Sequence, residues 1–430
     1  MEKLLNQIKD KFEQSEVFFS SSEDVSVTIA NGKLDAIESN KESGYSVRTF
    51  HKGVAGFAYS NKISDTKPIL ESLDISLIGK VEGNVDLPDP ADLPDLNTYN
   101  SQIEKVSSDS INDICEDLYK FIKNNVDAEI TTSGWKSVTE KRLLNSKGVD
   151  YSGKSSSSGL YASIDYPGGG GSLNKVFKSK STPEYCEKEI SKLINMYKTG
   201  LNIVKPEGGK MKVLFMPNTV FSLIWRLYAA AKADAVDQGV SVLKEKIGDK
   251  IFSEKITIYN DPLNDEFPGA QAFDGEGVVN KRNYIVENGV FRSFYGDLKF
   301  CKKIGIEPTG GSARGSWRGQ PSSSMSAMYV EPGEHSLEEL IAMMDKGIII
   351  FGVLGAHSGN IPNGDLSIGI NPCFYVENGE IKGRVKDSML AGNVYDIMKN
   401  VLAVGNKSES GYMVTSPPIL LDNINIAIKQ

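Results

Sequence analysis

Three closely spaced prolines impose the strongest constraint on the fold of this chain. Pro88, Pro90 and Pro94 lack a backbone N–H donor, and each biases the preceding residue toward an extended conformation. The segment can therefore continue neither a helix nor a central strand. We interpret residues 87–100 as a linker that follows a first unit, residues 1–86.

Hydrophobic periodicity predicts the contents of the first two units. In residues 1–86, Leu4 and Ile8 lie on one face of an N-terminal helix, and an antiparallel β-meander follows. The first turn of the meander is Asn31-Gly32, a pair that tolerates the positive φ angles of a tight hairpin. Residues 101–204 mix helical and strand periodicity, which predicts a mixed middle unit.

Residues 205–430 are predicted to form a C-terminal, mainly β domain that is barrel-like and has a few helices. One helix is expected over 220–233. Ser336 and Glu339 predict the capping box of a later helix, which we expect to end at Gly347. Because helices and strands are mixed without strict βαβ alternation, the fold class is α+β.

Charge and hydropathy exclude two classes of function. The balance of 48 basic against 56 acidic residues gives a net charge of −8, the wrong sign for direct nucleic-acid binding through phosphate neutralisation. The longest strongly apolar run, Ile348–Ala356, is far shorter than the roughly 18 residues that a membrane span needs. The N-terminus also lacks the apolar centre of a signal peptide, so we expect a cytoplasmic protein without membrane contact.

One segment satisfies the spacing of a phosphate-binding loop. Residues 148–155 contain two glycines, Lys154 and Ser155 in the required order. A phosphate loop must also enter a helix, whose N-terminal amides face the phosphates. Alternation through Leu160 and Ile164 instead predicts a strand, so nucleotide binding through Lys154 is the weaker interpretation.

Two polar loops are candidates for peptide or partner binding. The first contains Gly310, Arg314 and Trp317, which combine a flexible backbone with a guanidinium and an indole. Such a loop can hold a carboxylate or an extended peptide, although a surface connection is the alternative. The second loop contains the most interesting of the three histidines; its candidate residues are His357, Asn360 and Asp365.

Several short segments of the chain form a recognisable set. They are Lys246-Ile-Gly-Asp-Lys-Ile251, Ile256-Thr-Ile-Tyr-Asn-Asp261-Pro262, Phe273-Asp274-Gly-Glu276-Gly277-Val278, Glu287-Asn-Gly289, Thr309-Gly310, Asn363-Gly-Asp365-Leu-Ser367, Val376-Glu-Asn-Gly379 and Leu390-Ala-Gly392-Asn393. Together these segments resemble the TldD/PmbA family, also called modulators of DNA gyrase. The N-terminal meander also fits the family. The resemblance therefore extends over nearly the whole chain.

The resemblance implies a metallopeptidase site that this chain does not carry. Family members of the TldD branch look like zinc peptidases with a His-Glu-x-x-x-His helix and a cysteine ligand near the C-terminus. In this chain, the resemblance places Ile224, Trp225 and Ala229 at the metal-helix positions, and none of them is a zinc donor. Cys373, the last cysteine, precedes the family position, and residues 404–411 contain no cysteine. We therefore expect no catalytic or metal-binding residue here.

This departure is typical of the PmbA branch, also called TldE. The resemblance implies a non-metal subunit of a cytoplasmic peptidase assembly that degrades or processes unfolded peptides. It would form a hetero-oligomer with a zinc-bearing TldD-type paralogue, or a homodimer when alone, and would itself hold no cofactor and be inactive alone. The alternatives are a free-standing hydrolase that uses His357 with Asp365, and a nucleotide-binding protein that uses Lys154.

Overall fold

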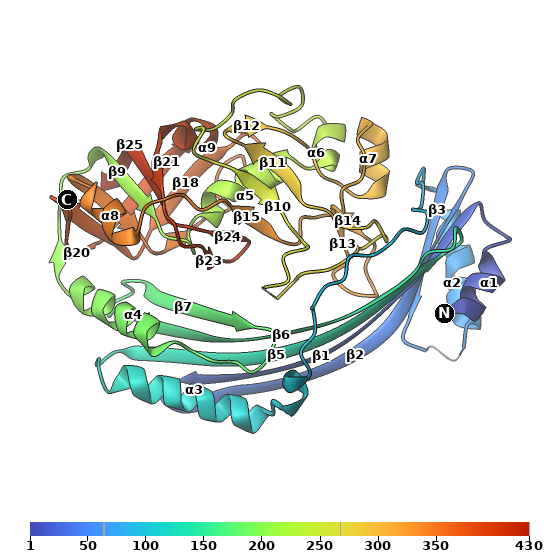
Figure 1. Ribbon diagram of the computed structural model, residues 1–430, viewed down its shortest axis with the longest axis horizontal. Coiled ribbons are helices and arrows are strands. Elements are labelled where there is room, and N and C mark those ends of the chain that lie inside the picture. The colour runs from blue at the N-terminus through green and yellow to red at the C-terminus, as the bar shows by residue number, and fades with distance from the viewer. Residues whose placement is uncertain (63–64, 267, 430) are drawn as a thin grey trace.

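A long curved sheet forms the base of the molecule, and the C-terminal unit lies over it (Figure 1). The computed structural model describes residues 1–62, 65–266 and 268–429. The seven strands of the long sheet lie in the order β4 (Val81–Glu82), β3 (Val54–Ser60), β2 (Lys33–His51), β1 (Gln14–Ala30), β5 (Glu129–Asn145), β6 (Asp150–Asp165) and β7 (Ser172–Ser179). All neighbours in this sheet are antiparallel.

The pairing of β1 with β5 joins the N-terminal meander to the middle unit in one continuous sheet. Phe18 lies opposite Leu143, and Val27 lies opposite Gly134. The predicted meander is present, and its turn residues Asn31 and Gly32 have φ angles of 51° and 76°. Such positive angles match the right-handed twist of the two long strands that they connect.

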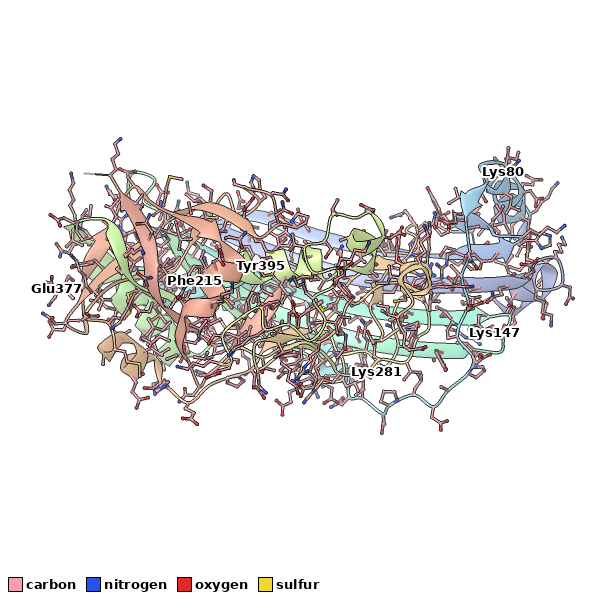
Figure 2. All side chains as sticks on the ribbon, turned by 90° about the horizontal axis from the view of Figure 1, so that it is seen from above. Lys80, Lys147, Phe215, Lys281, Glu377 and Tyr395 are labelled. Atoms are coloured by element: carbon pink, nitrogen blue, oxygen red, sulfur yellow. The ribbon has the colours of Figure 1, made fainter. Side chains whose placement is uncertain are left out.

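Helices cover the convex face and the two ends of the long sheet. α3 (Ser108–Lys123) places Ile111, Cys115, Leu118 and Ile122 against the convex face, and α4 (Glu187–Gly200) follows β7. α1 (Glu2–Ile8) and α2 (Lys67–Ile78) pack at the opposite end. Seen from above, the end that carries Lys80 and Lys147 lies far from Glu377 of the C-terminal unit (Figure 2).

Residues 83–100 contain neither helix nor strand, as the prolines predict, yet they pack against the sheet. Leu87 is buried, and the side chain of Gln14 bonds this segment on both sides of Asp86. The Gln14 amide donates to the Val85 carbonyl at 2.7 Å and accepts from the Leu87 N–H at 2.6 Å. The linker is therefore held along the surface of the sheet.

The C-terminal unit contains two further sheets. The larger comprises β17 (Val353–Leu354), β18 (Asp365–Ile370), β21 (Ser388–Asn393), β25 (Ile419–Ile428), β9 (Gly209–Phe215), β16 (Lys346–Ile350), β19 (Cys373–Glu377), β20 (Glu380–Val385) and β8 (Ile203–Val204), with β22 (Val401–Val404) paired to β25. The smaller comprises β12 (Val290–Phe291), β11 (Asn283–Glu287), β10 (Ile258–Asn260), β15 (Met328–Val330), β24 (Val414–Ser416) and β23 (Glu409–Ser410). β13 (Ser312–Ala313) pairs with β14 (Ser322–Ser323). This mixture confirms the α+β prediction.

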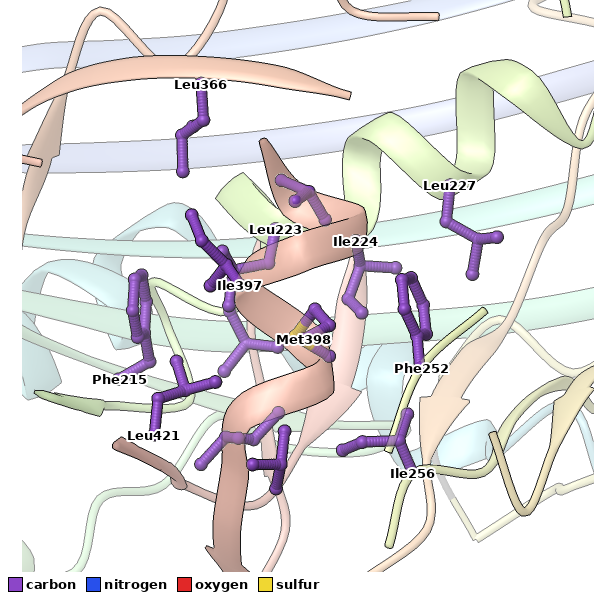
Figure 3. Close-up of a cluster of buried hydrophobic side chains, with 14 of the residues drawn as sticks. Phe215, Leu223, Ile224, Leu227, Phe252, Ile256, Leu366, Ile397, Met398 and Leu421 are labelled. Carbon is purple, nitrogen blue, oxygen red and sulfur yellow. The ribbon is translucent and has the colours of Figure 1, made fainter. Parts of the chain in front are cut away.

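The core of the C-terminal unit forms where α5 (Phe221–Ala230) packs against the larger sheet (Figure 3). Leu223, Ile224 and Leu227 of α5 are buried together with Phe215 of β9 and Leu421 of β25. Burial of each of these side chains contributes about 1.5 to 3 kcal/mol. α5 is consequently a core element of the C-terminal unit.

Two helix predictions in this unit need correction. The helix predicted over 220–233 ends at Ala230, because Lys232 is extended with φ −70° and ψ 136°, and α6 (Ala233–Asp237) then begins. The capping box of Ser336 and Glu339 is present, but α8 (Leu337–Ala342) ends before Gly347. Gly347 lies in β16, where a Cβ would overlap the Lys212 carbonyl of β9. The C-terminal unit also contains α7 (Leu298–Ile304) and α9 (Val394–Ile397).

A buried network of four charges joins the long sheet to the C-terminal unit. Arg48 of β2 donates to both oxygens of Glu16 of β1, at 2.7 and 2.9 Å, and to Glu276 at 2.8 Å. Arg314 also donates to Glu16. The four side chains are at most 7% exposed, so each charge depends on its partners for solvation.

Asp274 lies next to this network and is itself fully buried. Its Oδ1 accepts the N–H groups of Glu276 at 2.8 Å and Val278 at 3.0 Å. Burial, together with the Glu276 carboxylate, raises the pKa of Asp274 to about 7.

We predict that Arg48→Met lowers the free energy of unfolding by about 3 to 5 kcal/mol, because Glu16 and Glu276 remain buried without their shared partner. The matched control is Arg142→Met, which removes a guanidinium that is 35% exposed and paired on the surface. The control should lose less than about 1 kcal/mol. Urea denaturation of both variants measures the difference, and equal losses would contradict a special role of the buried network.

We predict that Asp274→Asn removes a pH dependence of stability. Between about pH 4 and pH 7, folded Asp274 retains a proton that the unfolded chain releases, so the native state loses stability as the pH rises. The asparagine keeps the oxygen that accepts both N–H bonds. As the pH rises over this range, the free energy of unfolding of Asp274→Asn should increase relative to that of the wild type by at most about 1.4 kcal/mol per pH unit. Urea titrations at pH 5 and pH 7 test this; a constant difference would contradict it.

Candidate functional site

A cavity of about 740 Å³ lies between β7, α4 and the C-terminal unit. We call it the α4 cavity. Its lining includes Asn174, Lys175, Val176 and Lys178 of β7, Glu189, Lys192, Leu193 and Met196 of α4, Thr219 and Phe221 near the start of α5, Phe351 and Leu354, and Lys407, Glu409, Ser410 and Tyr412. Apolar side chains thus alternate with charged ones, as in a site that binds an extended, amphipathic ligand.

Glu189 is the centre of the charged part of this wall. Its carboxylate lies 3.3 Å from Lys175, 3.3 Å from Lys192 and 3.6 Å from Lys407. Lys175 also pairs with Glu409 at 2.8 Å. Burial opposes ionisation of Glu189, but the lysines outweigh it and lower the pKa of this carboxyl. These ion pairs tie α4 and β7 to the segment that contains Glu409.

Lys178 is different from the other lysines of the wall. Its Nζ donates to the Ser410 hydroxyl at 3.0 Å, and no ion pair to a carboxylate is present within the described residues. Burial lowers the pKa of Lys178. Lys178 is consequently the cation of this wall that is available to a ligand carboxylate or carbonyl.

The two segments that the family resemblance aligns with the metal positions both border the α4 cavity. α5 reaches it through Phe221, and the C-terminal segment reaches it through residues 406–407 and 409–412. Along α5, Ile224 is buried in the core, whereas Trp225 and Ala229 are partly exposed. None of the three offers a nitrogen, oxygen or sulfur ligand of the kind that zinc requires.

The cysteines do not supply a substitute donor set. Cys115, Cys301 and Cys373 are buried in different parts of the fold, and Cys186 is exposed. Burial raises the pKa of Cys373 to about 12, which disfavours the thiolate that binds metals. Within the described residues, no group of three or more His, Cys, Asp or Glu side chains is arranged to hold a metal ion. The residues present therefore do not fit the zinc site of a metallopeptidase.

The loop with Gly310, Arg314 and Trp317 packs onto the long sheet. Gly310 has φ +83°, and a Cβ there would overlap the Asn280 side chain. Arg314 belongs to the buried charge network. The Trp317 ring covers Gly44 of β2, where a Cβ would overlap the indole. This loop consequently attaches the C-terminal unit to β1 and β2.

The loop with His357, Asn360 and Asp365 lies on α5. Arg226 of α5 is fully buried and donates to the carbonyls of Ser358 at 2.9 Å and Asp365 at 3.1 Å. His357 is exposed, and Asp365 accepts from Asn393 at 3.3 Å. Among the described residues, no hydrogen bond joins His357 to Asp365, and none joins this loop to the loop of Arg314. The structure therefore places the two candidate loops at separate positions.

Lys154 lies in β6, which confirms the strand prediction for this segment. Its Nζ lies 3.4 Å from Glu104 and 3.2 Å from Glu140, and it stacks over Tyr99. No helix begins after Ser155 in the described part of this segment, since β6 continues to Asp165. The amide cradle of a phosphate loop is thus missing.

Sequence analysis did not identify Lys175, Lys178 and Glu189 as members of a site. Lys175 and Lys178 alternate with apolar residues on a short strand, and Glu189 occupies an ordinary first helical turn. Each pattern is common on protein surfaces. These three side chains come together only through long-range packing. Glu409, the ion-pair partner of Lys175, does lie in residues 404–411, the segment compared above with the family's cysteine position.

Two family models and several known proteins match this chain. The family model described as PmbA/TldA metallopeptidase C-terminal domain matches residues 208–428, and the model described as PmbA/TldA metallopeptidase domain 1 matches residues 15–77. A metalloprotease of Methanothermobacter thermautotrophicus is 28% identical over 95% of this chain and 91% of its own length. The metalloprotease PmbA of Escherichia coli O157:H7 is 23% identical over 97% of this chain and 93% of its own length.

The fold is shared with a solved relative. The crystal structure of TldE from Thermococcus kodakarensis superposes with a TM-score of 0.92 at 23% identity and covers 99% of both chains. Within the described residues, no helix has the length and apolar character needed to cross a membrane. The C-terminal family match alone spans more than half of the 430 residues, and the chain therefore belongs to the TldD/PmbA family of metallopeptidase-related proteins.

Proposed function

We propose that this chain is the non-metal subunit of a TldD-type peptidase assembly that processes unfolded peptides. The observation that carries the proposal is the combination of a formed α4 cavity with an α5 helix that lacks metal donors at Ile224, Trp225 and Ala229. A hydrolytic zinc would then come from a TldD-type paralogue. This chain would contribute a wall that holds the substrate.

The lining of the α4 cavity suits an unfolded peptide. Leu193, Met196 and Phe221 offer apolar contact to side chains of many shapes. Lys178 offers one cationic donor, and the Glu189 cluster is neutralised by its own lysines. Contacts of this kind tolerate variation in sequence, which is what a peptide-degrading assembly requires.

Neither alternative function gains support from a specific contact. A hydrolase based on His357 and Asp365 needs the two side chains within hydrogen-bond reach. A nucleotide site at Lys154 needs a free ammonium at a helix N-terminus, whereas Lys154 is paired with two carboxylates on a strand.

We predict that the isolated chain retains no stoichiometric zinc, because its histidines and cysteines do not converge. Elemental analysis after dialysis against a weak chelator measures the metal content. A TldD-type paralogue treated in the same way serves as the positive control. About one zinc ion per chain after dialysis would show that a site exists in a different arrangement.

We predict that the chain elutes as a complex with its TldD-type paralogue and increases hydrolysis of unfolded peptides above that of the paralogue alone. Met196→Trp, which fills the α4 cavity, should reduce this hydrolysis at least tenfold and leave the complex intact. The matched control is Met389→Trp, at a β21 position that is 50% exposed. It should retain the hydrolysis of the wild type.

Size-exclusion chromatography and a fluorescent peptide assay, with and without chelator, test this prediction. Equal hydrolysis by the paralogue alone would rule out the subunit model. Hydrolysis by this chain alone in the presence of chelator would favour a free-standing hydrolase.

A further inference from the structure

We propose that a second cavity in this chain binds the remote part of the same peptide in an extended conformation. The inference rests on the proposed function and names where the substrate lies. The second cavity, of about 680 Å³, is enclosed by β1, β5 and β6 below, by residues 93–99 at the side and by residues 269–275 and 312–317 above. We call it the serine cavity.

Small hydroxyl side chains form the floor of the serine cavity. Ser22, Thr139 and Ser155 are register partners on the neighbouring strands β1, β5 and β6. Alternation places them on the face of Lys141 and Gly153, beneath the C-terminal unit. Among the described residues, none accepts or donates a hydrogen bond through these three hydroxyls. The floor therefore presents a row of unused donors and acceptors.

Two buried polar atoms in the roof also have no partner. Trp317 is 4% exposed and Ser312 is 2% exposed, and both line the cavity. The indole Nε1 of Trp317 and the hydroxyl of Ser312 make no hydrogen bond within the described part of the chain. An indole N–H can only donate, so the missing partner is an acceptor such as a peptide carbonyl. Unpaired buried polar atoms cost free energy, which a ligand would recover once these covered side chains turn toward it.

The cavity favours a ligand without strong net charge, because the charged groups in its wall are ion-paired, exposed or, like Lys141 and Asp274, hydrogen-bonded to neutral groups. The pairs are Glu42 with Arg318 at 2.6 Å, Lys154 with Glu104 and Glu140, and Arg314 with Glu16. Lys141 donates to the Gln271 side chain at 2.8 Å and the Phe273 carbonyl at 3.1 Å. Asp95 is exposed at the rim. Neutral peptide backbone with small polar side chains matches the remaining hydroxyl and N–H groups.

Register along β6 fixes the distance between the two cavities. Ser155 lines the serine cavity, and Gly159, four residues further along β6, is the register partner of Lys178 in the α4 cavity. Four residues of strand span about 13 Å. If each cavity accommodates about three extended residues, a peptide needs about ten residues to occupy both. Shorter peptides reach only one cavity.

Binding of labelled peptides to the purified chain tests the proposal by fluorescence anisotropy. The probes are five-residue and ten-residue peptides of one composition, rich in Gly, Ser and Asn with one Leu. The wild type should bind the ten-residue peptide at least tenfold more tightly. Ser155→Trp, which fills the serine cavity, should remove this advantage. The matched control is Ser43→Trp, at an exposed position of β2 outside the cavity, which should retain it.

Trp317→Phe tests the roof with little change of packing. It removes only the indole N–H and part of the ring, and should weaken binding of the ten-residue peptide about three- to tenfold. Thermal unfolding of each variant checks that the fold is intact. Equal affinities of wild type, Ser155→Trp and Trp317→Phe for the ten-residue peptide would overturn the proposal. Binding of a labelled neutral oligosaccharide, with no binding of either peptide, would also overturn it.

Hydrolysis by the complex separates this inference from the proposed function. With Ser155→Trp, partner-dependent hydrolysis of the five-residue peptide should stay at the wild-type level, because that peptide needs only the α4 cavity. Loss of the length advantage alone supports the serine cavity. Loss of partner-dependent hydrolysis in the wild type would reject the proposed function, while the anisotropy result would still decide whether the serine cavity binds peptide.

Discussion

The position of the C-terminal unit over the long sheet depends on the buried network of Glu16, Arg48, Glu276 and Arg314. Each guanidinium and each carboxylate has lost almost all contact with water, so the network is favourable only when all four groups meet. Apolar surfaces can slide past one another at small cost. The ion pairs that cross between the two parts, Arg48 with Glu276 and Arg314 with Glu16, cannot, and they fix how the C-terminal unit sits over this end of the long sheet.

The serine cavity arises from a change in side-chain size along the sheet. On β1, the positions that face the C-terminal unit pass from Glu16 and Phe18, which fill the interface, to Ser20 and Ser22, which leave it hollow. The register partners Thr139 and Ser155 are equally small. Since both sheets of a packed pair normally fill the space between them, a row of small hydroxyl side chains at this interface leaves a cavity.

Local chemistry determined which parts of this fold were predictable. The Asn31-Gly32 turn, the prolines of the linker and the Ser336 capping box act within a few residues, and each of these predictions is confirmed except for the end of the last helix. The merging of the first and middle units was not predictable, because it depends on pairing between Phe18 and Leu143, 125 positions apart. The charge network was not predictable for the same reason, because it joins residues that are far apart along the chain.

The sequence pattern predicted the helix that contains α5, apart from its end, but only the structure explains what its side chains do. Ile224 is part of the core, and Arg226 is buried among backbone carbonyls of Ser222, Ser358 and Asp365. A buried guanidinium is costly unless its donors are satisfied, so α5 and the 358–365 loop must stay together. The helix is thereby a rigid support for the part of the α4 cavity wall that Phe221 forms.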